Sequence, residues 1–374
     1  MTPVSDLKNL VEQDPENCDL LFQLGLAYEN ESRYDEAATL YNRVIQLNSE
    51  HHEAHFRLGN LFFINGDDDK AHSLLHRAVT MEPQNGLYWN NLGYVYYRQG
   101  DLDKSLACFE AAHQANPELE EVQVMIARLR FETQDFDGAL KKTNEIKNLD
   151  SIYPDVILTR GSVFLAQQEF KKTESEFNRA VKLFPENPGV LSTAGNFAII
   201  QNDKKTARLH FDKALSIDPN HYESLIGQGN LALRNQNYPQ AKQKFNYAMQ
   251  IDDSRYEAYH GLSTVAYSQD DPVGLEKWTE SGIERAPQHP DLRYYRGLCL
   301  ERKGDIKNAR ISFLDALALN PFHFQSHFEL ATIYQVHMND TRQCKGHLKK
   351  VTQIAPETKT AKVAQEMLDK LEKS

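Results

Sequence analysis

The sequence predicts an all-α fold, a solenoid in which helix-turn-helix repeats stack one after another along the chain. The first observation behind this prediction is a small residue that recurs at one constant spacing, in a single register. The second is that each segment between two such residues divides at a polar turn, such as "QGD" or "NGD", into two helix-length stretches. Each stretch has apolar residues at i, i+3, i+4 and i+7. The recurring small residues are Gly25, Gly59, Gly93, Ala127, Gly161, Gly195, Gly229, Ser263, Gly297 and Ala331.

A third observation concerns the stretch "YWNNLGYVYYRQGD", from Tyr88 to Asp101, which reads as a helix with apolar side chains on several sides. A helix on the surface of a globular domain normally has a single apolar stripe. This helix therefore needs its own partner helix and the next repeat to cover it, as happens when each repeat touches only its neighbours.

The second helix of each repeat carries a register of its own. A small residue follows twelve positions after the first one in most repeats, and a bulky residue comes four positions later. A small residue where two helices cross lets their axes approach, and the bulky side chain fills the space beside it. The bulky residues are Tyr41, Leu75, Phe109, Phe177, Phe211, Phe245 and Phe313. A proline that cannot continue a helix closes many repeats: Pro83, Pro117, Pro185, Pro219, Pro287 and Pro321.

This pattern resembles the tetratricopeptide repeat, whose signature is W-x2-L-G-x2-Y, then A-x3-F, then P, with a period of about 34 residues. The third repeat has Ser105 in place of the alanine and otherwise matches at Trp89, Leu92, Gly93, Tyr96, Phe109 and Pro117. The resemblance implies a right-handed superhelical α-solenoid that binds other proteins. It covers residues 18–356 as ten repeats that begin at residues 18, 52, 86, 120, 154, 188, 222, 256, 290 and 324.

The two ends of the chain are expected to act as caps, because a terminal repeat has a neighbour on one side only. Residues 1–17 would form an N-terminal half-repeat with a helix at residues 3–13, and residues 357–374 a C-terminal capping helix. Three repeats depart from the pattern: the fourth has Thr143 and the eighth Thr279 at the bulky position, and the tenth carries one extra residue in "YQVHMNDTRQCKG". Altered curvature and neutral drift are the two interpretations of these departures.

The resemblance places the first helix of each repeat on the concave side, where apolar and aromatic residues would form a strip with polar residues between them. An exposed apolar strip rimmed by polar groups marks an interaction site, which an extended peptide or a helix could cover. The alternative is that these aromatic residues only pack within the helix layer. The predicted partner-binding residues are Phe56, Arg57, Asn60, Phe63, Asn91, Tyr94, Tyr97, Arg98, Arg128, Phe131, Leu165, Asn196 and Asn230.

Three arginines of this set, Arg57, Arg98 and Arg128, are expected on the same wall. Because the guanidinium fork suits carboxylates, one hypothesis is that they bind an acidic segment or a C-terminal carboxylate of a partner. The alternative is a set of intramolecular pairs with Glu53, Glu121, Glu132 or Asp155.

The resemblance also allows a test for the clamp with which chaperone-binding family members hold a C-terminal carboxylate. Asn60 and Asn91 fit two of its places. Phe56, however, stands where the clamp requires a lysine, and Glu121 and Met125 replace its basic pair. The sequence predicts that this clamp is absent.

No pattern typical of an enzyme occurs, whether a phosphate-binding glycine loop, a nucleophile elbow or an HExxH helix. His72 and His76, and His323 and His327, are i, i+4 pairs without an assured third ligand, so we expect core or surface histidines and no metal site. We predict no catalytic residue, no cofactor and no enzymatic activity.

Composition bears on the kind of partner. The formal net charge is −11, and residues 1–69 hold 14 acidic against 4 basic residues, which argues against nucleic acid as a ligand. No apolar run is long enough to span a membrane. The start of the sequence shows no secretory signal, and four widely spaced cysteines suit a reducing compartment, so we expect a cytoplasmic protein.

The sequence therefore predicts a protein-interaction scaffold or adaptor that binds a partner peptide or helix in a concave groove. Two alternatives stay open: a self-assembling homo-oligomeric scaffold, and an accessory subunit that regulates an envelope enzyme or a secretion or assembly machine.

Overall fold

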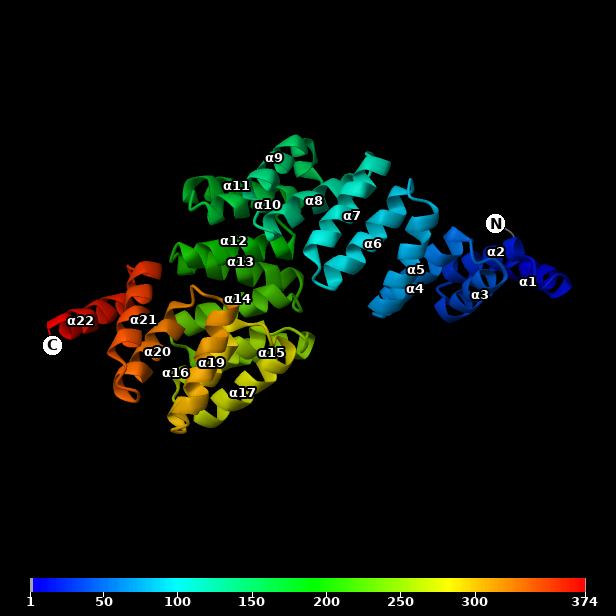
Figure 1. Cartoon of the computed structure of the whole chain (residues 1–374). Helices are drawn as coiled ribbons and strands as arrows, with labels where there is room; N and C mark the ends of the chain where they lie inside the picture. Colours follow the sequence, from blue (N-terminus) through cyan, green and yellow to red (C-terminus); the bar gives the residue numbers. More distant parts are fainter. Residues whose placement is uncertain (1–2, 374) are drawn as a thin grey trace. The chain divides into compact units, whose positions relative to one another are not determined.

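The computed structural model describes residues 3–373. Within this range the chain forms 22 α-helices and one 3-10 helix, with no strand (Figure 1). The predicted all-α class is confirmed. The helices follow one another in antiparallel pairs, and we call the first helix of each pair the A helix and the second the B helix.

The chain separates into two compact units, with the boundary between Phe184 and Pro185. The N-terminal unit contains α1 (Val4–Gln13), α2 (Cys18–Asn30), α3 (Tyr34–Leu47), α4 (His52–Ile64), α5 (Asp68–Met81), α6 (Gly86–Arg98), α7 (Leu102–Ala115), α8 (Glu120–Glu132), α9 (Phe136–Glu145), the 3-10 helix η1 (Lys147–Ser151), α10 (Pro154–Ala166) and α11 (Phe170–Leu183). The even-numbered helices from α2 onward are the A helices.

The C-terminal unit continues the same alternation. It contains α12 (Pro188–Ile200), α13 (Lys204–Ile217), α14 (Tyr222–Arg234), α15 (Tyr238–Ile251), α16 (Glu257–Ser268), α17 (Pro272–Arg285), α18 (Pro290–Arg302), α19 (Ile306–Leu319), α20 (Phe324–Val336), α21 (Thr341–Ile354) and α22 (Lys359–Lys373).

In the seven A helices that have a glycine at the register position, this glycine packs directly against the bulky residue of the B helix, as the sequence predicts. A Cβ added to Gly195 of α12 would lie 2.7 Å from the ring of Phe211 in α13. The same ring also meets Gly227 of the following A helix, so two glycines enclose it. Phe211, like Tyr41 and Phe313, is fully buried. This packing sets the close spacing of helices within each unit.

The turn inside each pair contains one residue with a left-handed backbone. It is a glycine in three turns, at Gly66, Gly100 and Gly304. In the other seven it has a side chain: Ser32, Gln134, Gln168, Asn202, Gln236, Asp270 and Asn339. A left-handed residue just past a helix end lets the chain reverse within a few residues.

A repeated hydrogen bond joins the end of one repeat to the next A helix. In six of the ten repeats the side chain of the fourth residue bonds to the backbone carbonyl six residues before it, as Trp89 Nε1 donates to Pro83 at 2.8 Å. His55 Nε2 meets the carbonyl of Ser49 at 3.0 Å in the same way. The corresponding donors elsewhere are Gln123, Tyr259, Arg293 and His327. The accepting carbonyl lies in the connection between two helices, where no backbone N–H of the described residues pairs with it.

The fourth repeat, one of the three that depart from the pattern, has an altered B helix. Helix α9 is 10 residues long, whereas α7 has 14, and η1 follows it. Asp150 of η1 accepts a hydrogen bond from Arg160 at 2.9 Å, with side chains only 2% and 3% exposed. Arg179 and Glu176 complete the network. This buried ion cluster occupies the place of regular B-helix packing.

The extra residue of the tenth repeat lies in its turn. Helix α20 begins at Phe324 and α21 at Thr341, which is one residue later than the spacing of the preceding pair, from Pro290 to Ile306, would place it. The B helices of the other repeats keep that shorter spacing from the start of their repeat. At the two ends, Leu7 of α1 and Ala361, Ala364 and Leu368 of α22 are buried against their neighbouring helices.

Candidate partner-binding face

Most of the predicted partner-binding residues lie on three consecutive A helices of the N-terminal unit. Helix α4 carries four of them, α6 carries four and α8 carries two; these are Phe56, Arg57, Asn60 and Phe63, then Asn91, Tyr94, Tyr97 and Arg98, then Arg128 and Phe131. Leu165 follows on α10, whereas Asn196 and Asn230 lie on α12 and α14 of the C-terminal unit. We call the residues on α4, α6 and α8 the A-helix face of the N-terminal unit.

The aromatic residues of this face are half-buried and pack against other rings. Phe56 stacks on Tyr88 with ring centroids 4.5 Å apart. Tyr94 meets the edge of Phe109 at 5.1 Å, and Phe131 contacts Phe136. Part of their area therefore serves packing within the helix layer, as the alternative interpretation expects, and part stays accessible.

Each of the three arginines forms an ion pair within the chain. Arg57 pairs with Glu29 at 3.2 Å, Arg98 with Asp68, and Arg128 with Glu132 at 2.8 Å. Intramolecular pairing was the alternative to binding an acidic partner. Of the expected carboxylates only Glu132 takes part. The other two pairs bridge repeats, because each carboxylate comes from the preceding repeat.

Two of these arginines also cover aromatic rings of the preceding A helix. The guanidinium of Arg98 lies 3.7 Å from the ring centroid of Phe63, and that of Arg128 lies 5.5 Å from the centroid of Tyr97. The Tyr97 hydroxyl donates to Glu132 at 3.1 Å. Burial raises the pKa of Tyr97, so the phenol stays protonated and remains a donor.

Amide side chains connect α4 to α6 across this face. Asn91 Nδ2 donates to Asn60 Oδ1 at 2.7 Å, and Asn90 Nδ2 donates to Asn91 Oδ1 at 3.1 Å. Asn90 Oδ1 is buried and has no hydrogen-bond partner among residues 3–373. Asn60 and Asn91 were among the predicted partner-binding residues, whereas Asn90 was not. Asn196 and Asn230 are exposed and belong to no such chain.

A pocket of about 450 Å³ opens at the start of the N-terminal unit. Its lining comes from α1, α2 and α4: Leu7, Gln23, Leu26, Ala27, Glu29, Asn30 and Arg57. Only Arg57 was among the predicted residues. The other six lining residues were not predicted from the sequence to bind a partner.

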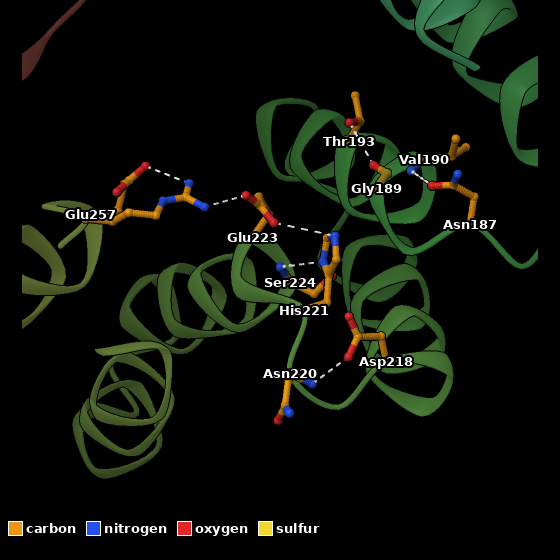
Figure 2. A network of polar contacts seen from close by, with 11 residues as sticks. Asn187, Gly189, Val190, Thr193, Asp218, Asn220, His221, Glu223, Ser224 and Glu257 are labelled. Atoms are coloured by element: carbon orange, nitrogen blue, oxygen red, sulfur yellow. Dashed lines mark hydrogen bonds and ion pairs between the residues drawn. The ribbon is translucent and has the colours of Figure 1, made fainter. Parts of the chain in front are cut away.

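Polar networks at the starts of the A helices account for several carboxylates and histidines. Figure 2 shows His221, whose Nδ1 accepts from the backbone N–H of Ser224 at 3.3 Å and so caps α14. Glu223 lies 3.4 Å from His221 Nε2 and pairs with Arg255 at 2.6 Å. Arg255 also binds Glu257 at 3.0 Å, which joins the starts of α14 and α16. These carboxylates have structural partners at helix N-termini.

The histidines that the sequence singled out lie apart from any metal-binding arrangement. His72 Nε2 contacts the Tyr96 hydroxyl at 2.8 Å, and His327 Nδ1 contacts His347 at 2.8 Å. Burial, together with the nearby His327, lowers the pKa of His347 to about 4. Across residues 3–373, no group of three or more His, Cys, Asp or Glu side chains could hold a metal ion. All four cysteines are free.

None of the helices among residues 3–373 is both long enough and apolar enough to cross a bilayer.

Together, the stacked helix pairs and the polar-aromatic face define an α-helical repeat protein. Models of the tetratricopeptide repeat match residues 86–119 and residues 5–50, 22–71 and 275–333. These segments therefore contain tetratricopeptide repeats, and the predicted resemblance is confirmed there. No curated protein matches the sequence.

Solved structures of similar fold cover most of the chain at low identity. Human IFIT1, solved as a dimer with m7Gppp-AAAA, has a TM-score of 0.60 at 16% identity over 90% of this chain and 86% of that chain. Yeast Tom70 has a TM-score of 0.46 at 16% identity over 95% of this chain and 88% of that chain. A chain of the APC/C hetero-tetramer Cut9-Hcn1 has a TM-score of 0.44 at 14% identity over 95% and 96%. The likeness to IFIT1 shows a shared fold.

Proposed function

We propose that the chain is a cytoplasmic interaction scaffold that binds a polypeptide segment of a partner on its A helices. The family supports an interaction role in general. The observation that supports this surface in particular is the chain of amide side chains from Asn60 through Asn91 to Asn90, in which Asn60 and Asn91 are only half-buried. The accessible parts of these two amides could bond to the backbone of a bound segment.

The half-buried rings beside this chain would supply the apolar part of the contact. Phe63, Tyr97 and Phe131 stand at the same position of three successive repeats, and each is half-buried. Aromatic residues at interfaces contribute most when they become fully desolvated. The three arginines are each already paired, so their binding of an acidic segment stays a prediction that would require exchange of partners.

A double substitution tests this function. Tyr97→Ala with Phe131→Ala should reduce capture of partner proteins from a cell extract at least about tenfold, because two hot-spot residues are removed. Partner identity is read by mass spectrometry and affinity by titration with the recovered partner. Phe170→Ala, an exposed aromatic residue at the start of a B helix in the same unit, is the matched control. Unchanged affinity in the double variant, with helix content intact, would contradict the proposal.

IFIT1, which has a similar fold, was solved as a dimer with m7Gppp-AAAA. Binding of nucleic acid and self-association are therefore the two alternatives to binding of a protein partner. We propose protein as the ligand because the net charge is −11 and the three arginines of the face are neutralised by carboxylates. Light scattering across concentration and salt measures self-association; a salt-insensitive monomer would exclude the self-assembling scaffold.

A further inference from the structure

The A helices of the C-terminal unit present a second face, formed by α16, α18 and α20. Rings follow one another along it. Tyr295 lies 5.7 Å from His260 and 6.0 Å from Tyr267, and Tyr294 lies 5.6 Å from Tyr295. Tyr267 is 38% exposed, and the other rings are partly exposed. This face has the same aromatic character as its counterpart in the N-terminal unit.

The unpaired charged side chains of this second face are acidic, whereas the charged residues of the A-helix face of the N-terminal unit are arginines. Glu301, near the end of α18, and Glu329 of α20 are half-buried beside Tyr294. Among residues 3–373, neither carboxylate forms an ion pair. The basic residues that follow Glu301 are engaged elsewhere: Arg302 binds Asp270 at 3.0 Å and covers Tyr267, and Lys303 binds Glu276 at 2.5 Å.

The environment of the two carboxyl groups shows the cost of leaving them unpaired. Burial, followed by the charge of Glu301, raises the pKa of Glu329 to about 7, although a hydrogen bond from Tyr294 opposes the shift. Burial also raises the pKa of Glu301, with His337 acting in the opposite direction. A cation placed between the carboxylates would remove their repulsion and compensate their desolvation.

We propose that this face docks a basic segment of a partner polypeptide, with Glu301 and Glu329 receiving one lysine or arginine side chain. This inference rests on the proposed function, in which the A helices bind a polypeptide. It further specifies that the segment bound at this face is basic. Charge complementarity favours this occupant: unpaired carboxylates stand among accessible rings, and rings also bind cations on their faces.

The test uses the full chain and fluorescein-labelled ten-residue peptides that alternate leucine with lysine, glutamine or glutamate. The lysine peptide should bind at least about tenfold more tightly than the glutamine or glutamate peptide by fluorescence anisotropy. Glu301→Gln with Glu329→Gln should abolish this preference, and thermal melting verifies that the variant is folded. Glu366→Gln, an exposed glutamate of α22, is the matched control and should change nothing.

Binding should also depend on pH in a defined direction. Since Glu329 must lose its proton to act as an anion, affinity for the lysine peptide should rise about tenfold between pH 6 and pH 8. Glu329→Gln should remove this part of the rise. The nearby titratable groups Glu301, Tyr294 and His337 remain in both proteins, so the difference between the two pH profiles isolates Glu329.

Three results would overturn the inference: equal binding of lysine and glutamate peptides, unchanged binding by the double glutamine variant, or no binding of any peptide. The proposed function is judged separately by the Tyr97→Ala and Phe131→Ala variant. If that variant loses its partner while the glutamates prove irrelevant, the interaction role stands and only the basic segment is wrong.

Discussion

The glycines of the A helices show how strongly single residues constrain this chain. The ring of Phe211 is enclosed by Gly195 and Gly227, so it has no space to move away from an added methyl group. Steric crowding at a buried ring costs more than the gain in helix propensity from replacing glycine.

Gly195→Ala should therefore destabilise the C-terminal unit by about 1–3 kcal/mol. Gly346→Ala is the control, because no atom lies within 4 Å of the added Cβ and the residue is in the interior of α21. That change should stabilise by about 0.5–1 kcal/mol. Urea unfolding followed by circular dichroism measures both. If both substitutions changed the free energy of unfolding in the same direction, contact with the Phe211 ring would not be what decides the effect at Gly195.

Residue-scale prediction from sequence worked for packing but named only one of the carboxylates that pair with the three arginines, Glu132. The pairing of Gly195 with Phe211 follows from a fixed spacing, so the sequence contains it. The partner of Arg57 is Glu29, which lies 28 residues earlier, and sequence alone cannot choose it over Glu53. That choice depends on side-chain rotamers and on the rotation between adjacent helix pairs.

At the level of elements, the turns carry the most testable feature. Gln168 connects α10 to α11 with φ of 61°, a conformation that costs a residue with a Cβ about 1–2 kcal/mol, whereas Gly100 has φ of 79° without this cost.

Gln168→Gly should raise the free energy of unfolding of the N-terminal unit by about 1 kcal/mol, and Gly100→Ala should lower it by a similar amount. A Cβ on Gly100 would meet nothing within 4 Å, so the backbone alone sets the expected effect. Thermal midpoints measured side by side check the pair. A destabilised Gln168→Gly variant would mean that the glutamine side chain makes a contact worth more than the strain.

Element boundaries follow largely from the sequence, because α4, α6 and α10 begin at the first residues of their predicted repeats. The 3-10 helix η1 was not foreseen. It is held by Asp150 and Arg160, whose pairing becomes visible only when η1 and α10 are brought together. For the candidate site, the partner-binding role of the residues on α4, α6 and α8 stays a prediction, and the burial of Asn90 Oδ1 was not foreseen.

For the whole molecule, all substantial helix contacts among residues 3–373 join helices that are at most two positions apart in chain order. Stability is then close to a sum of neighbouring interactions. The division at Phe184 and Pro185 was not predicted, because Pro185 is also an ordinary closing proline of the repeat pattern.

A large cavity in one helix pair should therefore loosen that region first. Phe313→Ala in α19 removes a fully buried ring, at a cost of about 3–5 kcal/mol. Hydrogen exchange followed by mass spectrometry should show faster exchange in α18, α19 and α20, with α12 and α13 unaffected. Ile311→Ala, at an exposed site of α19, is the control. A uniform increase from α12 to α22 would instead reveal a single cooperative block.

The hydrogen bond between the fourth residue of a repeat and the preceding carbonyl bears on how such repeats are detected in amino-acid sequences. Tryptophan, histidine, glutamine, tyrosine and arginine all make this bond, whereas Leu21, Ile157, Leu191 and Leu225 stand at the same position of four other repeats and have no side-chain donor. A consensus written around tryptophan will pass over junctions whose geometry is intact. Searches for distant members of this architecture should accordingly weigh the constant spacing of the helices above the identity of the residue at this position.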